Sequence, residues 1–189
     1  KRDFSQPCWD GGQDLSGKTI FVYAEQGFGD TLQFVRYVPL LARRGGRVAL
    51  EVQPQLRGLL AATEGLSSIS IPGEAPPPFD YHCPLLSMPR AFATRIETIP
   101  AELPYCFVPE DRVAKWQALR RAGSRRRVGF VSSGNIENWR VRRRNIPLAV
   151  LMPLFKREGI DFVCLQKDID ATDRATLATI PNVDVIGPK

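Results

Sequence analysis

The chain has 189 residues, 43% of them hydrophobic, which is enough for an ordinary core in one large domain or two small ones. The formal net charge of +6 favours an anionic partner, although many basic proteins carry such a surplus without one. The four cysteines are widely spaced and there is one histidine, so a zinc site is excluded and reduced thiols in the cytoplasm are the simplest interpretation. No apolar run approaches the roughly 18 residues that span a bilayer, so no membrane span is expected.

Residues 1–17 show no periodicity and are interpreted as a connecting segment whose Trp9 packs onto the domain. Residues 18–24 form a β-branched and aromatic run of strand length, and a loop with two glycines follows. Apolar residues then recur every three to four positions, which predicts a helix with a kink or a new start at Pro39. The other elements expected in this half are strands at 47–52 and 68–71, a helix at 54–62, and one short strand within the proline-rich residues 72–89.

A long connection at 92–110 and an amphipathic helix at 111–122 lead to a run of arginines, where the composition changes sharply. We place a boundary near Ser124, which gives a first domain at 18–123 and a second at 124–189. The second is expected to contain strands at 128–132, 161–166 and 183–186 and helices at 147–157 and 173–179. This alternation predicts an α/β protein with a Rossmann-like parallel sheet and the start of a second one. Three strands make a poor sheet alone, so we expect the second domain to be incomplete.

The loop after the first strand carries Glu25, Gln26, Gly27, Gly29 and Asp30. The two glycines are expected to let the backbone pass close to the sheet edge. Asp30 falls where the helix begins, so one interpretation is that it only caps the free N–H groups there. The other is that it faces a ligand, because open α/β sheets bind ligands beyond the carboxyl ends of their strands. A carboxylate in this place suits a sugar hydroxyl better than a phosphate.

A dinucleotide-binding fold is the alternative for the same loop. The fingerprint G-x-G-x-x-G needs a small third residue, and this chain has Leu32 in that place. Asp30 would also repel a pyrophosphate on the helix N-terminus. Glu51, at the end of the next strand, resembles the acid that binds the ribose in such folds, so this alternative stays open.

The loop at 132–148 is the second candidate site. Ser133, Gly134 and Asn135 follow a strand, and a run of arginines, Arg142, Arg143 and Arg144, precedes a helix opened by a proline. Guanidinium groups and free N–H groups at a helix start both bind phosphate, so the loop is predicted to hold a diphosphate. It could instead be a solvated basic loop, or bind nucleic acid through Trp139. The basic residues lie in two short runs and do not spread along one face, so we expect no nucleic-acid partner.

Two smaller patterns have a structural interpretation. His82 is a lone histidine among apolar neighbours, and such histidines are more often structural than ligand-binding. Asp168 and Asp170 form a D-x-D pattern, which in some sugar transferases holds a divalent ion. With Asp173 close by, capping of the following helix is the preferred interpretation, and no metal site is predicted.

Four segments carry a family resemblance: WDGG at 9–12, AEQGFGDTLQFVRYVPLLARRG at 24–45, FDYHCPLLSMPRA at 79–91, and SSGN followed by RRRNIPL at 132–148. They resemble the glycosyltransferase-like domains that follow tetratricopeptide repeats in bacterial proteins. These domains are similar to the lipopolysaccharide heptosyltransferases of glycosyltransferase family 9. The resemblance covers nearly the whole chain and implies a partial GT-B fold, with an acceptor-side and a donor-side domain.

The resemblance also implies site residues. The family's G-x-G-D turn falls on Gly27 to Asp30, which makes Asp30 the expected general base for the acceptor hydroxyl. The family's phosphate-binding basic residue corresponds to one of the arginines at 142–144. Ser133 replaces an alanine found in relatives. The expected substrates are a nucleotide sugar and a hydroxyl acceptor on a glycan, lipid or protein, with no cofactor and with tetratricopeptide repeats preceding the chain.

From these observations we expect an inverting, metal-independent glycosyltransferase. The family's acidic donor motif does not occur before Lys189, so these residues alone are expected to have little or no transferase activity. A non-catalytic binding or scaffolding module of the same fold is the alternative. A nucleic-acid-binding or dinucleotide-binding domain is the third.

Overall fold

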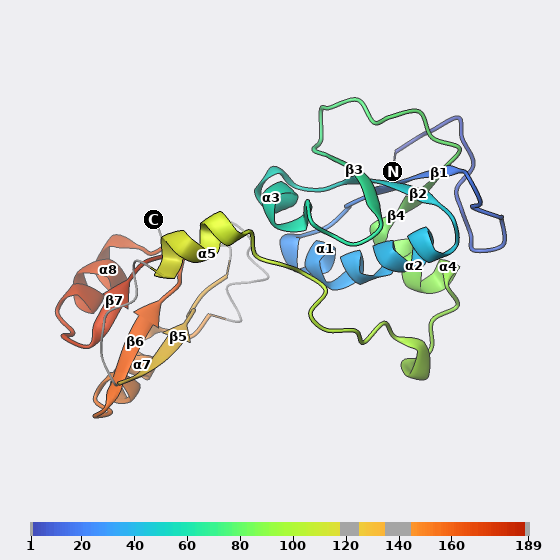
Figure 1. The fold of residues 1–189 in the computed structure, drawn as a ribbon. Coiled ribbons are helices and arrows are strands. Elements are labelled where there is room, and N and C mark those ends of the chain that lie inside the picture. The colour runs from blue at the N-terminus through green and yellow to red at the C-terminus, as the bar shows by residue number, and fades with distance from the viewer. Residues whose placement is uncertain (1, 118–124, 135–144, 188–189) are drawn as a thin grey trace. The chain divides into compact units, whose positions relative to one another are not determined.

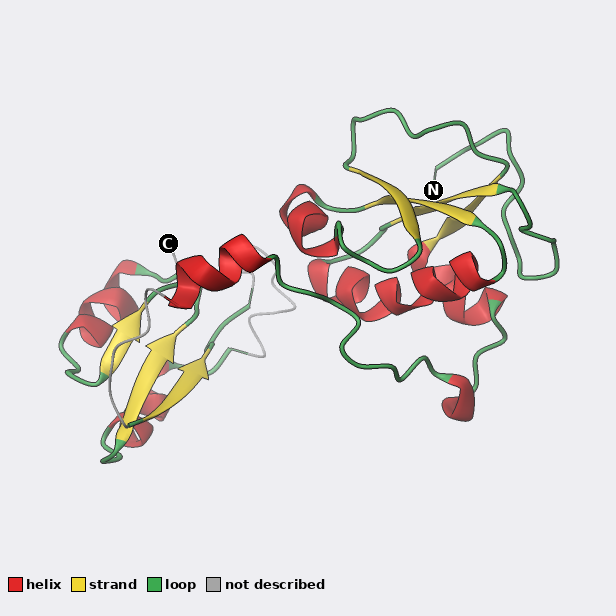
Figure 2. Ribbon diagram, in the orientation of Figure 1, coloured by secondary structure: helices red, strands yellow, loops and turns green. Residues whose placement is uncertain are grey.

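The computed structural model describes residues 2–117, 125–134 and 145–187 (Figure 1). The chain divides into two compact units, Lys1–Arg120 and Arg121–Lys189, which we call unit 1 and unit 2. Each unit contains a parallel sheet with helices (Figure 2), so the predicted α/β class is confirmed. No helix in the described part of the chain is long and apolar enough to cross a membrane.

The sheet of unit 1 has the strand order β3-β2-β1-β4, and all its pairings are parallel. The strands are β1 (Thr19–Tyr23), β2 (Arg47–Glu51), β3 (Leu66–Ser70) and β4 (Tyr81–Pro84). β1 is central, and every residue from Ile20 to Tyr23 is buried. A strand covered on both faces reads as a continuous apolar run, which is the pattern that identified it in the sequence.

The first helical region is interrupted before Pro39, which confirms the predicted kink or new start at this residue. It consists of α1 (Phe28–Phe34), a 3₁₀ turn η1 (Val35–Tyr37) and α2 (Val38–Arg43). Pro39 is in the first turn of α2, where its missing N–H costs nothing. Gly45 then ends the helix with a positive φ of 82°. Figure 1 shows α1 and α2 lying along one face of the sheet.

The remaining helices of unit 1 are short. The helix expected at 54–62 is a 3₁₀ turn η2 (Pro54–Leu56) followed by α3 (Arg57–Leu60). After β4 come η3 (Leu85–Ser87), α4 (Met88–Ala91) and η4 (Ile96–Thr98). The helix expected at 111–122 is described as α5 (Glu110–Gln117), and its expected last residues lie outside the described part.

The segment at the start of the chain packs into unit 1. Trp9 and Leu15 are each 1% exposed and belong to the main core cluster. The backbone N–H of Trp9 donates to the His82 carbonyl over 2.8 Å, and this bond connects the segment to β4. Phe4 packs on Phe21 and neighbouring rings at the other side of the sheet. The predicted packing of Trp9 is therefore confirmed.

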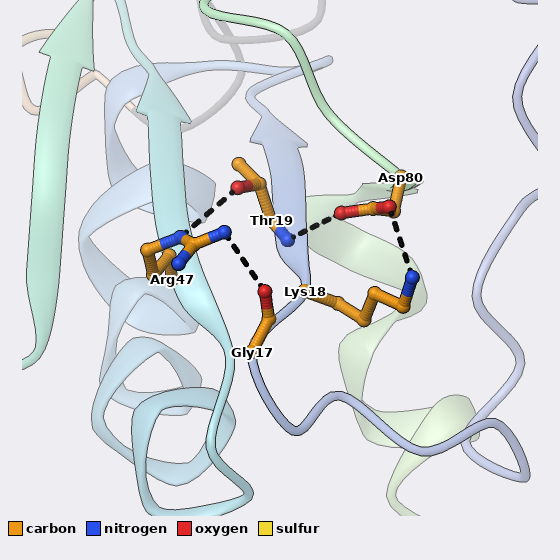
Figure 3. Close-up of polar contacts among 5 residues, drawn as sticks. All are labelled: Gly17, Lys18, Thr19, Arg47 and Asp80. Carbon is orange, nitrogen blue, oxygen red and sulfur yellow. Dashed lines mark hydrogen bonds and ion pairs between the residues drawn. The ribbon is translucent and has the colours of Figure 1, made fainter.

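A polar cluster lies at the amino ends of β1 and β2 (Figure 3). Asp80 accepts a hydrogen bond from the Thr19 N–H over 2.8 Å and one from Lys18 Nζ over 3.3 Å. Arg47 donates to the Gly17 carbonyl over 2.8 Å. The hydrogen bond from Thr19 and the charge of Lys18 lower the pKa of Asp80. These bonds join residues 17–19, Arg47 and Asp80 at the end of the sheet opposite the loop after β1. We therefore expect the cluster to stabilise the fold and not to bind a ligand.

Unit 2 has the strand order β5-β6-β7, again all parallel. Its elements are β5 (Arg126–Phe130), α7 (Leu148–Phe155), β6 (Ile160–Cys164), α8 (Ala171–Ala178) and β7 (Val183–Val185). β5 begins and ends two residues earlier than predicted. The last pair of its ladder is Phe130 with Cys164, and the N–H of Ser132 is bonded to a side chain instead.

The core of unit 2 is smaller than that of unit 1. Its buried cluster comprises Leu148, Phe155, Phe162, Cys164 and Leu177. None of the five residues of β5 is fully buried, in contrast to β1. Apolar side chains are also exposed in α7 and directly after β5 and β6. They are Val150 and Leu154 in α7, Val131 after β5 and Leu165 after β6.

Candidate functional site

The loop after β1 places Asp30 at the third position of α1. Gly27 precedes the helix with extended backbone, and its N–H donates to Asp30 Oδ2 over 3.1 Å. The capping interpretation of Asp30 is therefore confirmed in part: its carboxylate bonds an N–H at the helix start, but the N-cap residue itself is Gly27. The helix begins at Phe28 because the glycine takes the capping position, and the aspartate reaches back to the glycine N–H, as the acid of a capping box does.

The loop is held from beneath by two side chains. Thr31 is fully buried, and its hydroxyl donates to Gln53 Oε1 over 3.0 Å. Gln53 Nε2 in turn donates to the Gln26 carbonyl over 2.7 Å. Gln53 follows β2, so these bonds fasten the loop of the first strand to the end of the second. Sequence analysis gave neither residue a role: Thr31 lies within the segment at 24–45 that carries the family resemblance, and Gln53 belongs to no motif.

The predicted acceptor-binding residues lie together at the surface of this loop. Glu25, Gln26, Gly27 and Gly29 are exposed and Asp30 is partly exposed. No donor in the described part of the chain other than the Gly27 N–H bonds to the Asp30 carboxylate. The carboxylate thus retains lone pairs that can accept a hydrogen bond from a ligand hydroxyl.

The expected close approach of the two glycines to the sheet edge is wrong. A Cβ at Gly29 would have no heavy atom within 4 Å, and one at Gly27 would meet only Asp30 Oδ2, at 3.5 Å. Neither glycine has a positive φ. What the two glycines provide is open space above the loop, beside the carboxylate.

Two other candidates from the sequence have structural partners. Glu51 is 4% exposed and forms an ion pair with Arg2, so its carboxylate already has a hydrogen-bond donor within the protein. That pairing argues against a ribose-binding role. The His82 ring packs against that of Phe4, tilted by 52° with the centroids 4.8 Å apart, and burial lowers the pKa of His82. The aromatic setting of His82 agrees with the structural interpretation.

Unit 2 has a cavity of about 320 Å³ at the carboxyl ends of β5 and β6. Its polar lining comes from the loop after β5, from Asn145, from Gln166 and from three aspartates, and its apolar lining from residues around α7 and α8. The lining residues are Ser132, Ser133, Asn145, Ile146, Pro147, Leu148, Cys164, Gln166, Asp168, Ile169, Asp170, Asp173 and Leu177. Pockets of this size and mixed lining are typical of small-molecule sites.

The N–H groups of the loop after β5 already have partners. Those of Ser132 and Ser133 donate to Gln166 Oε1 over 3.2 and 3.0 Å. That of Gly134 donates to Asn145 Oδ1 over 3.2 Å. A phosphate could bind the N–H groups of Ser133 and Gly134 only by displacing a carboxamide oxygen. Asn135 and the arginines at 142–144 lie outside the described residues, as does Trp139, so the structure does not place these predicted ligands.

The aspartates of the cavity are arranged around the start of α8. Asp170 Oδ1 accepts a hydrogen bond from the Asp173 N–H over 2.8 Å and caps the helix, which confirms the capping interpretation of the D-x-D pattern. Burial raises the pKa of Asp173, and the nearby Asp170 raises it further. Asp168 is exposed at the cavity wall. Hydroxyl groups of a ligand are suitable donors to these carboxylates.

Comparison with known proteins supports the fold of the whole chain. No family model matches the sequence, and no curated protein does. A solved structure of a glycosyl transferase family 9 protein from Veillonella parvula is similar, with a TM-score of 0.64 and 9% sequence identity. The match covers 94% of this chain and 71% of the other. Both units of this chain therefore share the fold of a family 9 glycosyltransferase.

Proposed function

We propose that the chain is part of a glycosyltransferase that moves a sugar from a nucleotide-sugar donor to a hydroxyl acceptor. The observation that carries the proposal is the cavity of unit 2, because it combines carboxamides, carboxylates and apolar side chains at the carboxyl end of a parallel sheet. The shared fold with a family 9 glycosyltransferase gives independent support.

In this proposal unit 2 takes the donor. The carboxylates of Asp168 and Asp170 repel phosphate but accept hydrogen bonds from hydroxyls, so the cavity suits an uncharged, hydroxyl-bearing part of the nucleotide sugar. The diphosphate would then lie toward the loop after β5. The positive charge that it needs is assigned to the arginines at 142–144, and this assignment remains a prediction.

Unit 1 takes the acceptor, with Asp30 as the general base. The Asp30 carboxylate would accept the proton of the acceptor hydroxyl while the oxygen attacks the anomeric carbon. The bond from that carbon to the nucleoside diphosphate breaks at the same time, with inversion, and the leaving group takes the electron pair. Arginine charge, rather than a metal ion, is proposed to stabilise the departing diphosphate.

Donor binding is tested by titration calorimetry of the 189-residue chain with ADP, CDP, GDP and UDP and their sugar conjugates. We expect saturable binding that is selective for one base, and weaker binding of the sugar conjugate by Asp168→Asn. The control is Glu158→Gln, an acid at the other end of the sheet, which lines a different cavity. Absence of binding by all these ligands would refute the donor site.

Catalysis is tested on the protein in its full natural length, by following release of the nucleoside diphosphate. Removal of a general base lowers turnover by about 10²- to 10⁴-fold, so Asp30→Asn should have an effect of this size. Asp3→Asn, a change at an exposed aspartate of the same unit, should leave turnover unchanged. Normal turnover in Asp30→Asn would remove the aspartate from the mechanism.

A non-catalytic binding module is the second candidate, and one observation favours it. Ser133 and Gly134 were predicted to hold phosphate, and their N–H groups are bonded to side-chain carboxamides. Such a module would bind a sugar or nucleotide in the cavity but would release no nucleoside diphosphate. The two assays above therefore separate the two functions.

A further inference from the structure

Gln166 connects the two strand ends that form the cavity of unit 2. It is the second residue after β6 and is only 6% exposed. Its Oε1 accepts hydrogen bonds from the N–H groups of Ser132 and Ser133, which follow the neighbouring strand β5. One carboxamide oxygen thus fixes two successive peptide groups of the loop.

The backbone around Gln166 is itself tightly held. The N–H groups of Ile186 and Gly187 both donate to the Cys164 carbonyl, over 3.1 and 3.2 Å. A Cβ at Gly187 would collide with the carbonyl oxygen of Gln166, so only glycine allows the segment after β7 to pass this close. The backbone of Gln166 is therefore fixed by its neighbours, so its side chain can hold the loop after β5 in one position.

The two donors of the loop determine how the carboxamide is oriented. Because both partners are N–H groups, the oxygen must face them, and Nε2 must lie on the other side of the amide carbon. No acceptor among the described residues bonds to Nε2, and Gln166 lines the cavity. Nε2 is not among the described buried side-chain atoms that lack a partner, and the cavity is the place where this nitrogen can meet an acceptor of a ligand.

Unit 1 has a matching residue. Gln53 is the second residue after β2, as Gln166 is the second after β6, and both reach the loop that follows the first strand of their unit. The bonding differs. Both ends of the Gln53 carboxamide have partners, Thr31 and Gln26, whereas only the oxygen of Gln166 has partners in the described part. Among the described residues, the NH2 group of Gln166 thus donates to none, whereas that of Gln53 already donates one hydrogen bond, to the Gln26 carbonyl.

We propose that Gln166 is the positioning residue of the donor site, which holds the loop after β5 through Oε1 and donates from Nε2 to an oxygen of the bound nucleotide sugar. This proposal rests on the proposed function of unit 2. One side chain then couples the shape of the loop to occupancy of the cavity. A ligand oxygen gives Nε2 a hydrogen-bond acceptor inside the cavity.

Two substitutions distinguish the role of the acceptor Oε1 from that of the donor Nε2. Gln166→Met keeps the length of the side chain and removes both the acceptor and the donor. Gln166→Glu keeps an acceptor for Ser132 and Ser133 and removes the donor. The matched control is Gln53→Met, which removes the corresponding carboxamide from unit 1.

The experiment measures the Kd of ADP, CDP, GDP and UDP by calorimetry and amide hydrogen exchange at 132–133, on the 189-residue chain. We expect Gln166→Met to weaken binding of the preferred nucleotide by about 10- to 100-fold and to accelerate exchange at 132–133. Gln166→Glu should weaken binding while exchange stays slow. Gln53→Met should leave the Kd unchanged.

The outcomes distinguish this proposal from the function on which it rests. A Kd for Gln166→Met within about two-fold of wild type would overturn the positioning role and leave the donor site intact, because loss of one good hydrogen bond exceeds that change. Faster exchange without a change in Kd would mean a purely structural role for Gln166. If the wild-type chain binds none of the nucleotides, the donor site and the role of Gln166 both fail.

Discussion

The loops after β1 and after β5 each follow the first strand of their unit, but the N–H groups of the two loops have different hydrogen-bond partners. In unit 1 the N–H of Gly27 is bonded by a carboxylate, that of Asp30. In unit 2 the N–H groups of Ser132, Ser133 and Gly134 are bonded by the neutral carboxamides of Gln166 and Asn145. A carboxylate neutralises the positive end of backbone dipoles, whereas a carboxamide leaves the net charge unchanged. The first loop therefore suits a hydroxyl ligand, whereas the carboxamides that bond the second loop carry no charge that would repel an anion.

The supports beneath the two loops also differ. β1 is a central strand with four buried residues in succession, whereas β5 is the first strand of a three-stranded sheet and has none. Rigid packing beneath a loop fixes its geometry, because close-packed cores resist small displacements. We expect the candidate base of unit 1 to be held more rigidly than the cavity of unit 2, and three predictions test this contrast.

The largest effect is expected from core truncation. Leu41 is fully buried in unit 1, and Leu148 is slightly exposed in unit 2. Leu→Ala changes at buried sites cost about 2–5 kcal/mol, and the cost increases with the cavity left behind. We expect Leu41→Ala near the upper end of this range and Leu148→Ala near the lower end, measured by hydrogen exchange of peptides from each unit. Equal losses in both units would contradict the difference in packing.

The next effect concerns the Thr31 hydroxyl, which bonds the glutamine that supports the loop of unit 1. Thr31→Val preserves the shape of the side chain and removes the hydroxyl that bonds to Gln53 and to the Gly27 carbonyl. Leaving a buried acceptor without its donor costs about 1–3 kcal/mol, and Gln53 is only partly buried, so we expect a loss near the lower end of this range by chemical denaturation and faster exchange at the start of α1. Thr172→Val, a change at an exposed threonine of α8, is the control and should have little effect.

The smallest effects concern two aspartates with opposite pKa shifts. The pKa of Asp80 is lowered in the folded state, so its carboxylate stabilises unit 1 above the ordinary Asp range, and this contribution is lost as the pH falls through the lowered pKa. The pKa of Asp173 is raised, so its contribution is complete below the ordinary range and is lost as the pH rises through the raised pKa.

Thermal unfolding of two variants across pH tests both signs. At neutral pH we expect Asp80→Asn to lower Tm slightly and Asp173→Asn to raise it slightly. The Asp80→Asn difference should shrink only as the pH falls through the lowered pKa of Asp80, below the ordinary Asp range, whereas the Asp173→Asn difference should shrink earlier, as the pH falls through the raised pKa of Asp173. Shifts of the same sign in the two variants would contradict the assigned environments of the aspartates.

The sequence by itself determined the elements with strong local signals. The apolar run at 18–24, the helical spacing after it, the interruption at Pro39 and the helix end at Gly45 were all found, because each depends on residues close together in the chain. The capping of α8 by Asp170 was found for the same reason. The family resemblance likewise depended on local motifs, and the shared fold agrees with it.

Only the tertiary structure decided how the two sites are built. Gln53 and Gln166 lie 27 and 33 residues from the nearest loop residues that they bond, so no local pattern relates them to those loops. The parallel pairing of neighbouring strands brings them together, because it aligns the carboxyl ends of β1 with β2 and of β5 with β6. The packing of the segment at the start of the chain pairs Arg2 with Glu51. The alignment of β5 with β6 lets Gln166 bond the N–H of Ser133, a residue that the sequence had assigned to phosphate.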